Sequence, residues 1–110
     1  MGVDIQKMKS FQGSSEVKVP GGKLVRVKCN VEGNKISKIQ ITGDFFTHPE
    51  ETIQRLEEEL TGLMVDTEKI RSRVTEFFQR QECTLIGVEP SDFIAAILKA
   101  ASPPRPEVNL

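Results

Sequence analysis

The chain has no tryptophan and no tyrosine, and its only histidine is His48. Any histidine-based catalytic diad or triad, and any histidine metal cluster, would depend on that single side chain. His48 stands directly before Pro49 and beside an expected helix start, where a capping or solvent-facing histidine is common. The sequence therefore offers little basis for general acid-base catalysis.

Cysteine is also scarce. The two residues, Cys29 and Cys83, lie far apart in the sequence, form no C-x-x-C pair and have no neighbouring histidine. Zinc sites usually need closely spaced cysteine or histidine ligands, so this spacing gives no sign of one. We expect both thiols to be free, as in a reducing compartment.

Long apolar runs and an excess of one charge are missing too. No apolar run approaches the roughly 20 residues that a bilayer span needs. Fifteen Lys and Arg stand against sixteen Asp and Glu, a balance that gives no general attraction to nucleic acid or to an anionic membrane. The acidic Asp4 and the lack of a long apolar core near it argue against a secretory signal. At 110 residues the chain has the size of one domain. Without a secretory signal or a membrane span, we expect it to be cytoplasmic and to have no membrane partner.

Motifs for phosphate binding and nucleophilic catalysis are absent as well. Pro20-Gly21-Gly22-Lys23 has two glycines and a lysine, but it lacks the Walker spacing and leads into an expected strand rather than a helix. No G-x-S-x-G elbow is present, and helix capping explains Ser91. Glu57, Glu58 and Glu59 radiate around an expected helix instead of converging on a cation, so we expect a solvated face.

Alternation of apolar and polar residues predicts three strands. The clearest covers residues 23–32, and Gly33-Asn34 suits a two-residue hairpin turn into a second strand over residues 35–42. The expected inner face consists of Val25, Val27, Cys29, Val31, Ile39 and Ile41. Ile36 has the opposite parity, which predicts a bulge near the turn or a contact outside the main core. An earlier edge strand starts at Glu16 and stops at Pro20.

Three helices are expected after the strands, over residues 47–62, 66–81 and 90–101. In the first, Thr47 would cap the helix and Pro49 would occupy the first turn. Between the second and third helices, residues 84–88 form a short apolar connector or a small extra strand.

Strands first and helices afterwards indicate an α+β fold, a three-stranded antiparallel meander followed by three helices packed on one face. This domain spans residues 16–101. A flexible N-terminal arm over residues 1–15 and an extended proline-rich tail over residues 102–110 are expected to flank it.

Two surfaces are candidates for a function. The first is the strand-to-helix junction around Gly43, Asp44, Phe45, Phe46 and His48, which holds two of the six phenylalanines and is either a packing corner or a docking surface. The second is the outward face of the sheet, which carries the four basic residues Lys18, Arg26, Lys28 and Lys38. That basic face could meet an acidic partner or a phosphate-bearing ligand, or it could serve only solubility.

The order of the motifs resembles a known family. It consists of Gly21-Gly22-Lys23-x-Val25-x-Val27, then Val31-Glu32-Gly33-Asn34-Lys35-Ile36, then Ile39-x-Ile41-x-Gly43-Asp44-Phe45-Phe46, and later Gly87-Val88-x-Pro90-x-Asp92-Phe93. In this order and spacing the motifs resemble the C-terminal accessory domain of lipoate-protein ligases. The similarity covers about residues 17–101.

The resemblance implies a helper role. The arginine- and glycine-rich segments of the family's large domain are absent and the chain starts at Met1, so the chain is similar to a separate, non-catalytic small subunit of a split, two-protein ligase. With a large catalytic subunit it would support ATP-dependent activation of lipoate to lipoyl-adenylate, before transfer to a lysine of a lipoyl-carrier domain. The complex would use ATP with Mg and lipoate, while this chain alone would bind no cofactor.

The expected partner interface is the corner with part of the basic face, namely Gly43, Asp44, Phe45, Phe46, His48, Arg26 and Lys28. Asp44 would orient a partner group or favour the positive end of the following helix. Two alternatives stay open. One is a stand-alone interaction module that binds an acidic protein or nucleic acid through Arg26, Lys28 and Lys38, and the other is an autonomous small enzyme that depends on His48.

Overall fold

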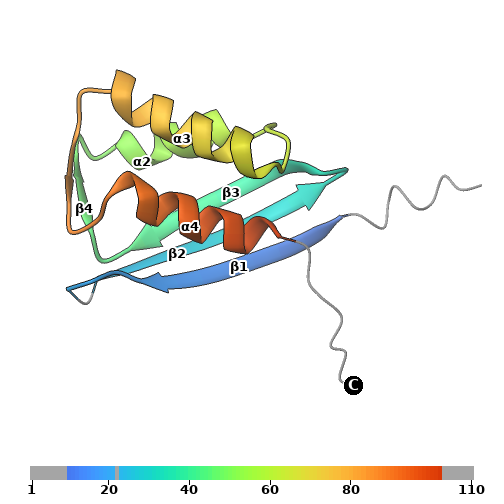
Figure 1. Ribbon diagram of the computed structural model, residues 1–110, viewed down its shortest axis with the longest axis horizontal. Helices are drawn as coiled ribbons and strands as arrows, with labels where there is room; N and C mark the ends of the chain where they lie inside the picture. The colour runs from blue at the N-terminus through green and yellow to red at the C-terminus, as the bar shows by residue number, and fades with distance from the viewer. Residues whose placement is uncertain (1–9, 22, 103–110) are drawn as a thin grey trace, which may run out of the picture.

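The computed structural model describes residues 10–21 and 23–102. The expected arm over residues 1–9, the expected tail from Pro103 onward and Gly22 of the expected turn lie outside the described residues. Three antiparallel strands form a sheet in their order along the chain, and three helices cover one of its faces (Figure 1). The predicted α+β fold, a meander followed by three helices on one face, is confirmed.

Strands β2 (Leu24–Glu32) and β3 (Lys35–Gly43) follow the expected alternation. Their two-residue turn, Gly33-Asn34, has positive φ at both positions, 58° and 69°, as a tight hairpin turn requires. Val27 pairs with Ile41 and Asn30 with Lys38, but the register then shifts so that Val31 faces Ile36. The extra residue turns the fully buried Ile36 inward, so the bulge expected from its parity is confirmed.

Strand β1 (Phe11–Lys18) begins five residues earlier than expected. The arm predicted up to Ser15 is therefore wrong over residues 11–15, which pair with β2 from Phe11 opposite Val31 to Ser15 opposite Val27. The small residues that suggest a loop are what lets helix α4 (Pro90–Ala101) lie close. The Ser15 hydroxyl donates to the carbonyl of Ala96 over 2.7 Å, and a Cβ on Gly13 would run into the carbonyl oxygen of Ala100.

The first helix, α2 (Thr52–Leu60), starts later than expected. Residues Phe46–His48 instead form strand β4, which pairs with β5 (Thr84–Ile86) in a second, two-stranded sheet. A residue before proline is disfavoured in the helical region, so His48 continues a strand more easily than it opens a helix. The predicted cap at Thr47 is wrong for this reason, whereas the small extra strand at residues 84–88 is confirmed.

Helices α3 (Thr67–Arg80) and α4 begin where expected. The Asp66 carboxylate accepts a hydrogen bond from the Lys69 amide over 3.0 Å and caps α3. At α4 the carboxylate of Asp92 accepts from the amide of Glu89 over 2.8 Å, so Ser91 is not the cap and that prediction is wrong.

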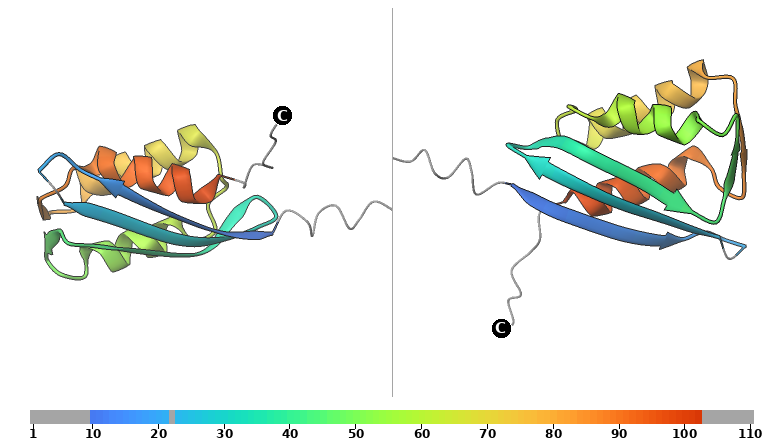
Figure 2. Two further views of the ribbon diagram at one scale, coloured as in Figure 1. Left: turned by 90° about the horizontal axis from the view of Figure 1, so that it is seen from below. Right: turned by 180° about the vertical axis from the view of Figure 1, so that it is seen from behind.

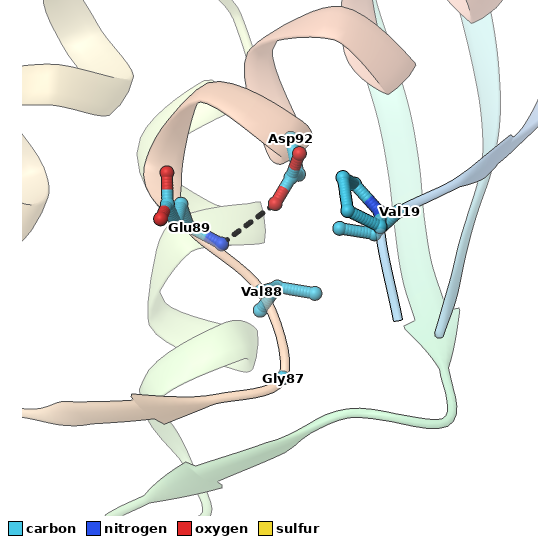
Figure 3. A pocket seen from close by; sticks show the side chains of 6 residues that line it. Val19, Gly87, Val88, Glu89 and Asp92 are labelled. Atoms are coloured by element: carbon cyan, nitrogen blue, oxygen red, sulfur yellow. Dashed lines mark hydrogen bonds between the residues drawn. The ribbon is translucent and has the colours of Figure 1, made fainter. Parts of the chain in front are cut away.

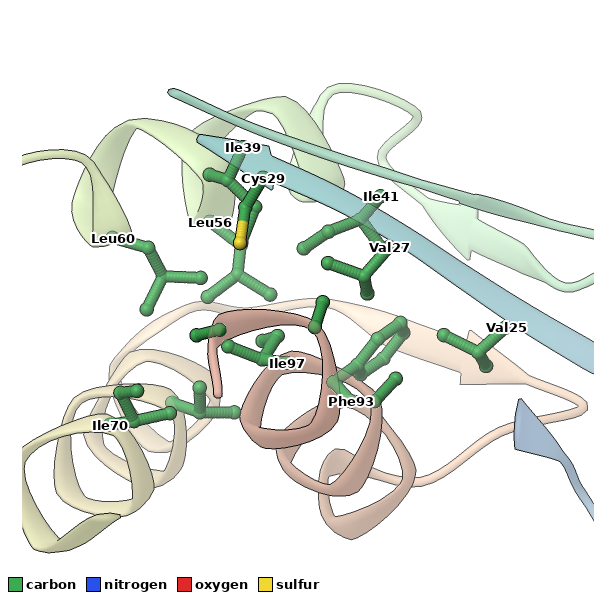
Figure 4. Close-up of a cluster of buried hydrophobic side chains, with 14 of the residues drawn as sticks. Val25, Val27, Cys29, Ile39, Ile41, Leu56, Leu60, Ile70, Phe93 and Ile97 are labelled. Carbon is green, nitrogen blue, oxygen red and sulfur yellow. The ribbon is translucent and has the colours of Figure 1, made fainter. Parts of the chain in front are cut away.

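The core lies between the sheet and the helices (Figure 4). All six expected inner-face residues of β2 and β3 are buried in it. The helices contribute the fully buried Leu56, Leu60, Ile70, Phe93 and Ile97, among others. Helix α4 packs on β1 and β2, α2 packs on β3, and α3 packs on both other helices. No helix in the described ranges is long and apolar enough to cross a bilayer.

The outer edge of β3 is covered by the chain that follows it. The amide of Ile36 donates to the carbonyl of Leu63, and the amide of Gly62 donates back to the carbonyl of Ile36. Farther along the same edge, the carboxylate of Glu57 on α2 accepts from the amide of Ile41 over 2.7 Å. Glu57 is thus not part of a solvated face, and that prediction is wrong here. Glu59 faces the guanidinium of Arg80 at 3.4 Å.

Replacing Glu57 by alanine is expected to destabilise the fold by about 1–3 kcal/mol, because the partly buried amide of Ile41 would lose its acceptor. Urea unfolding followed by circular dichroism measures this change. Glu58→Ala is the matched control, since Glu58 is exposed on the same helix and should change stability by about 0.5 kcal/mol or less. Equal stability of the two variants would show that the Glu57 hydrogen bond contributes nothing.

Candidate functional site

The corner after β3 is held by Gly43 and Asp44. The Asp44 carboxylate accepts a hydrogen bond from the Leu24 amide over 2.6 Å, and the Asp44 amide donates to the Leu24 carbonyl over 3.3 Å. A Cβ on Gly43 would meet that same carbonyl oxygen, so only glycine allows this close approach. Strand β4 separates Asp44 from α2, so the expected role of this carboxylate at the helix end is wrong.

The two phenylalanines of the corner have opposite environments. The Phe45 ring packs edge-on against Phe93 of α4 with centroids 5.2 Å apart, and Phe93 in turn stacks on Phe78 of α3 at 5.6 Å. Phe46, by contrast, is 65% exposed. The corner is therefore a packing corner at Phe45 and an exposed apolar surface at Phe46.

We call the pair of strands β4 and β5 the ribbon. Phe46 lies directly opposite Ile86, and His48 lies opposite Thr84. These four side chains are exposed on one face of the ribbon, its outer face, whereas Thr47 and Leu85 on the other face are partly buried. Ile86 is 54% exposed, so the ribbon presents an apolar cross-strand pair to solvent. Sequence reasoning found Phe46 and His48 but missed Ile86.

A pocket of about 390 Å³ lies beside the ribbon, between the end of β1 and the loop that leads into α4 (Figure 3). It is lined by Val19, Pro20, Gly87, Val88, Glu89 and Asp92. The side-chain carbons of Lys23 lie over Gly87, where an added Cβ would come within 3.2 Å of them. The described lining residues include two carboxylates, Glu89 and Asp92, and no Lys or Arg.

The basic residues lie elsewhere. The helices leave one face of the three-stranded sheet open (Figure 2). Arg26, Lys28, Lys18 and Lys38 are exposed, and the strand register places them on this open face. The Arg26 guanidinium donates to the Glu16 carboxylate over 2.8 Å, an exposed ion pair worth about 0–1 kcal/mol. The expected interface residues are thus divided between this open face and the ribbon with its corner.

Comparison with known proteins identifies the family. The family model described as the C-terminus of bacterial lipoate protein ligase matches residues 9–97. The chain belongs to this lipoate-protein ligase family. The match begins before β1 and ends within α4, so it includes both the open sheet face and the ribbon.

Two comparisons with the archaeon Thermoplasma acidophilum extend this result. Lipoate-protein ligase A subunit 2 of Thermoplasma acidophilum is 45% identical over 74 residues, which cover 67% of this chain and 76% of the relative. A solved structure from a study of a bipartite lipoate protein ligase and its E2 lipoyl domain, from the same organism, aligns with a TM-score of 0.72 at 40% identity. That alignment covers 80% of this chain and 96% of the neighbour's chain. The family resemblance seen in the sequence motifs is confirmed.

The cysteines and His48 complete the set of candidate reactive side chains in the described part of the chain. Burial raises the pKa of the Cys29 thiol and that of the Cys83 thiol, and both cysteines are free, so each is a poor nucleophile at neutral pH. Across residues 10–21 and 23–102, no three His, Cys, Asp or Glu side chains gather where they could hold a metal ion. His48 is exposed on the outer face of the ribbon.

Proposed function

We propose that this chain is the non-catalytic accessory subunit of a two-protein lipoate-protein ligase. It acts with a large catalytic subunit in the ATP-dependent activation of lipoate to lipoyl-adenylate, before the lipoyl group is transferred to a lysine of a lipoyl-carrier domain. The observation that carries the proposal is the 45% identity to a relative that is itself subunit 2 of a ligase. The matching fold in a study of a bipartite ligase supports the same assignment.

ATP with Mg and lipoate are assigned to the complex rather than to this chain alone. The pocket beside the ribbon has carboxylates at Glu89 and Asp92 where a nucleotide site would need cationic or amide donors. In this proposal the large subunit carries out the chemical steps of the reaction. The cytoplasmic location expected from the sequence is part of the proposal and stays a prediction.

The physical contribution of such a subunit is preorganisation. A rigid domain that buries part of its surface against the catalytic subunit can hold that subunit's substrate loops in the geometry that adenylation requires. The aromatic cluster of Phe45, Phe78 and Phe93 ties the corner to two helices, so the surface next to it is held in place before binding.

Reconstitution tests the proposal. The cognate large subunit is assayed for lipoyl-adenylate formation, by lipoate-dependent exchange of pyrophosphate into ATP, with and without this chain. We expect the chain to raise the rate by about tenfold or more, equivalent to about 1.4 kcal/mol of the activation barrier. This chain alone should show no turnover.

Two results would contradict the proposal. The first is a large subunit that works at full rate alone and does not change when the chain is added. The second is turnover by this chain alone that His48→Ala abolishes, which would identify an autonomous enzyme. The first result would instead favour the stand-alone module acting through Arg26, Lys28 and Lys38.

A further inference from the structure

The outer face of the ribbon carries the most exposed large apolar side chains among the described residues. Phe46 is 65% exposed and Ile86 is 54% exposed, and the two lie directly opposite each other on neighbouring strands. Two such neighbours form one continuous apolar surface, unlike the isolated Met64, which is 40% exposed beside the start of β3. An isolated exposed apolar residue needs no special explanation, but an adjacent cross-strand pair does.

The backbone that carries Phe46 and Ile86 is fixed by contacts of neighbouring residues with the domain. Phe45, the neighbour of Phe46, packs on Phe93 in the aromatic cluster. Thr47 and Leu85 are partly buried on the underside of the ribbon. Phe46 and Ile86 are therefore presented on a fixed scaffold, which lowers the entropy lost when a partner covers them.

The chain segments that contain the pair are acidic in sequence. Residues 44–51 and 82–92, which contain the two strands of the ribbon, hold no Lys or Arg. They carry six carboxylates, from Asp44, Glu50, Glu51, Glu82, Glu89 and Asp92. None of the six forms an ion pair with another described residue, including Lys23, whose side chain lies over Gly87. The apolar pair of the ribbon thus lies in two acidic chain segments, whose carboxylates form no ion pair in the described part of the chain. We call these six carboxylates the acidic border.

We propose that the outer face of the ribbon is the docking anchor for the large subunit, and that the large subunit offers an apolar hollow bordered by Lys and Arg. This inference rests on the proposed function. Phe46 and Ile86 would be buried in the hollow, because a large aromatic at the centre of an interface carries much of the binding energy. The acidic border would meet the basic rim and speed association.

The open sheet face is the competing surface. Its outward side chains include Lys18, Arg26, Lys28 and Lys38, and all four would lose hydration on burial. The Arg26–Glu16 pair would have to be covered or broken. A partner that docked there would need an acidic surface, so the two surfaces predict opposite charges on the large subunit.

Substitution of the anchor tests the proposal. Phe46→Ser and Ile86→Ser are made in the full chain, and binding to the cognate large subunit is measured by calorimetry. Each is expected to raise Kd by about tenfold or more, the usual loss for a central anchor residue. Met64→Ser is the matched control and should leave Kd unchanged. Circular dichroism and thermal melts of every variant confirm that the domain is folded.

Ionic strength provides a second readout. Raising NaCl from about 50 mM to about 500 mM should slow association, because screening weakens the attraction between the acidic border and a basic rim. Glu82→Lys should slow association further at low salt. Arg26→Glu, by contrast, should leave Kd unchanged or lower it slightly.

The outcomes separate the two proposals. If the wild-type chain does not bind the large subunit at all, the proposed function fails. If the wild-type chain binds, but Phe46→Ser and Ile86→Ser bind as tightly as Met64→Ser, the ribbon is not the anchor. If Arg26→Glu weakens binding while the two ribbon variants do not, the open face is the docking surface instead.

Discussion

Replacing Phe93 by alanine is expected to lower the free energy of unfolding by about 3–5 kcal/mol, the usual cost of deleting a buried phenylalanine. The ring is fully buried and contacts Phe45 and Phe78 at centroid distances of 5.2 and 5.6 Å. Its loss would leave a cavity where α4 meets the sheet, the corner and α3. Because small domains are stable by only about 5–15 kcal/mol, this is a large share of the total.

Urea unfolding measures the effect as a lower midpoint with an unchanged slope. Phe46→Ala is the control, since Phe46 is 65% exposed and should change stability by about 0.5 kcal/mol or less. The pair of variants thus separates stability from docking, because Phe93→Ala destabilises the domain while Phe46→Ala weakens only the complex. Similar midpoints for the two variants would mean that the aromatic cluster does not hold α4 in place.

The inner face of β2 and β3 could be predicted because one side of that sheet is buried. Side chains along a strand alternate between the two faces, so the position of each residue assigns its face. A shift of one residue in the strand register would place every core valine in water. Val27 and Ile41 are paired and buried as the alternation predicts. The parity of Ile36 predicted either a bulge or a contact outside the main core, and the shifted register shows that the bulge brings it to the core.

The first half of β1 could not be predicted, because these residues form a strand through contacts with α4, which lies far away in the sequence. Gly13, Ser14 and Ser15 have the composition of a turn. They form a strand because α4 lies on them, as the hydrogen bond from Ser15 to Ala96, 81 positions later, shows. Nothing in the local sequence indicates which strand α4 will cover.

The candidate site was predicted in part for similar reasons. The Gly-Asp-Phe-Phe motif pointed to the corner, but two of its side chains turned out to have structural contacts, Asp44 with Leu24 and Phe45 with Phe93. Ile86 was missed because a three-residue strand is too short to show a period. Its position opposite Phe46 follows only from the pairing of β4 with β5.

Replacing Gly13 by valine is the second substitution expected to have a large effect on stability. A Cβ at this position would run into the carbonyl oxygen of Ala100 in α4. The Cβ is fixed on the backbone of β1, and the carbonyl oxygen belongs to the backbone of α4. Neither group can rotate away, so β1 and α4 must move apart. Overpacking costs about 1–3 kcal/mol, occasionally more. Because this collision involves the backbone, we expect a loss of about 3 kcal/mol.

Ser14→Val is the matched control for this change. Ser14 is exposed on the open face of the same strand, where a β-branched residue favours the strand conformation. Its unfolding midpoint in urea should stay at or slightly above that of the wild type. Helix α4 contains both Ala100 and Phe93. If the valine at position 13 displaces α4, the contacts of Phe93 in the aromatic cluster are weakened by that change alone. The combined Gly13→Val and Phe93→Ala variant should therefore lose less stability than the sum of the single changes, and full additivity would show that the two contacts of α4 are independent.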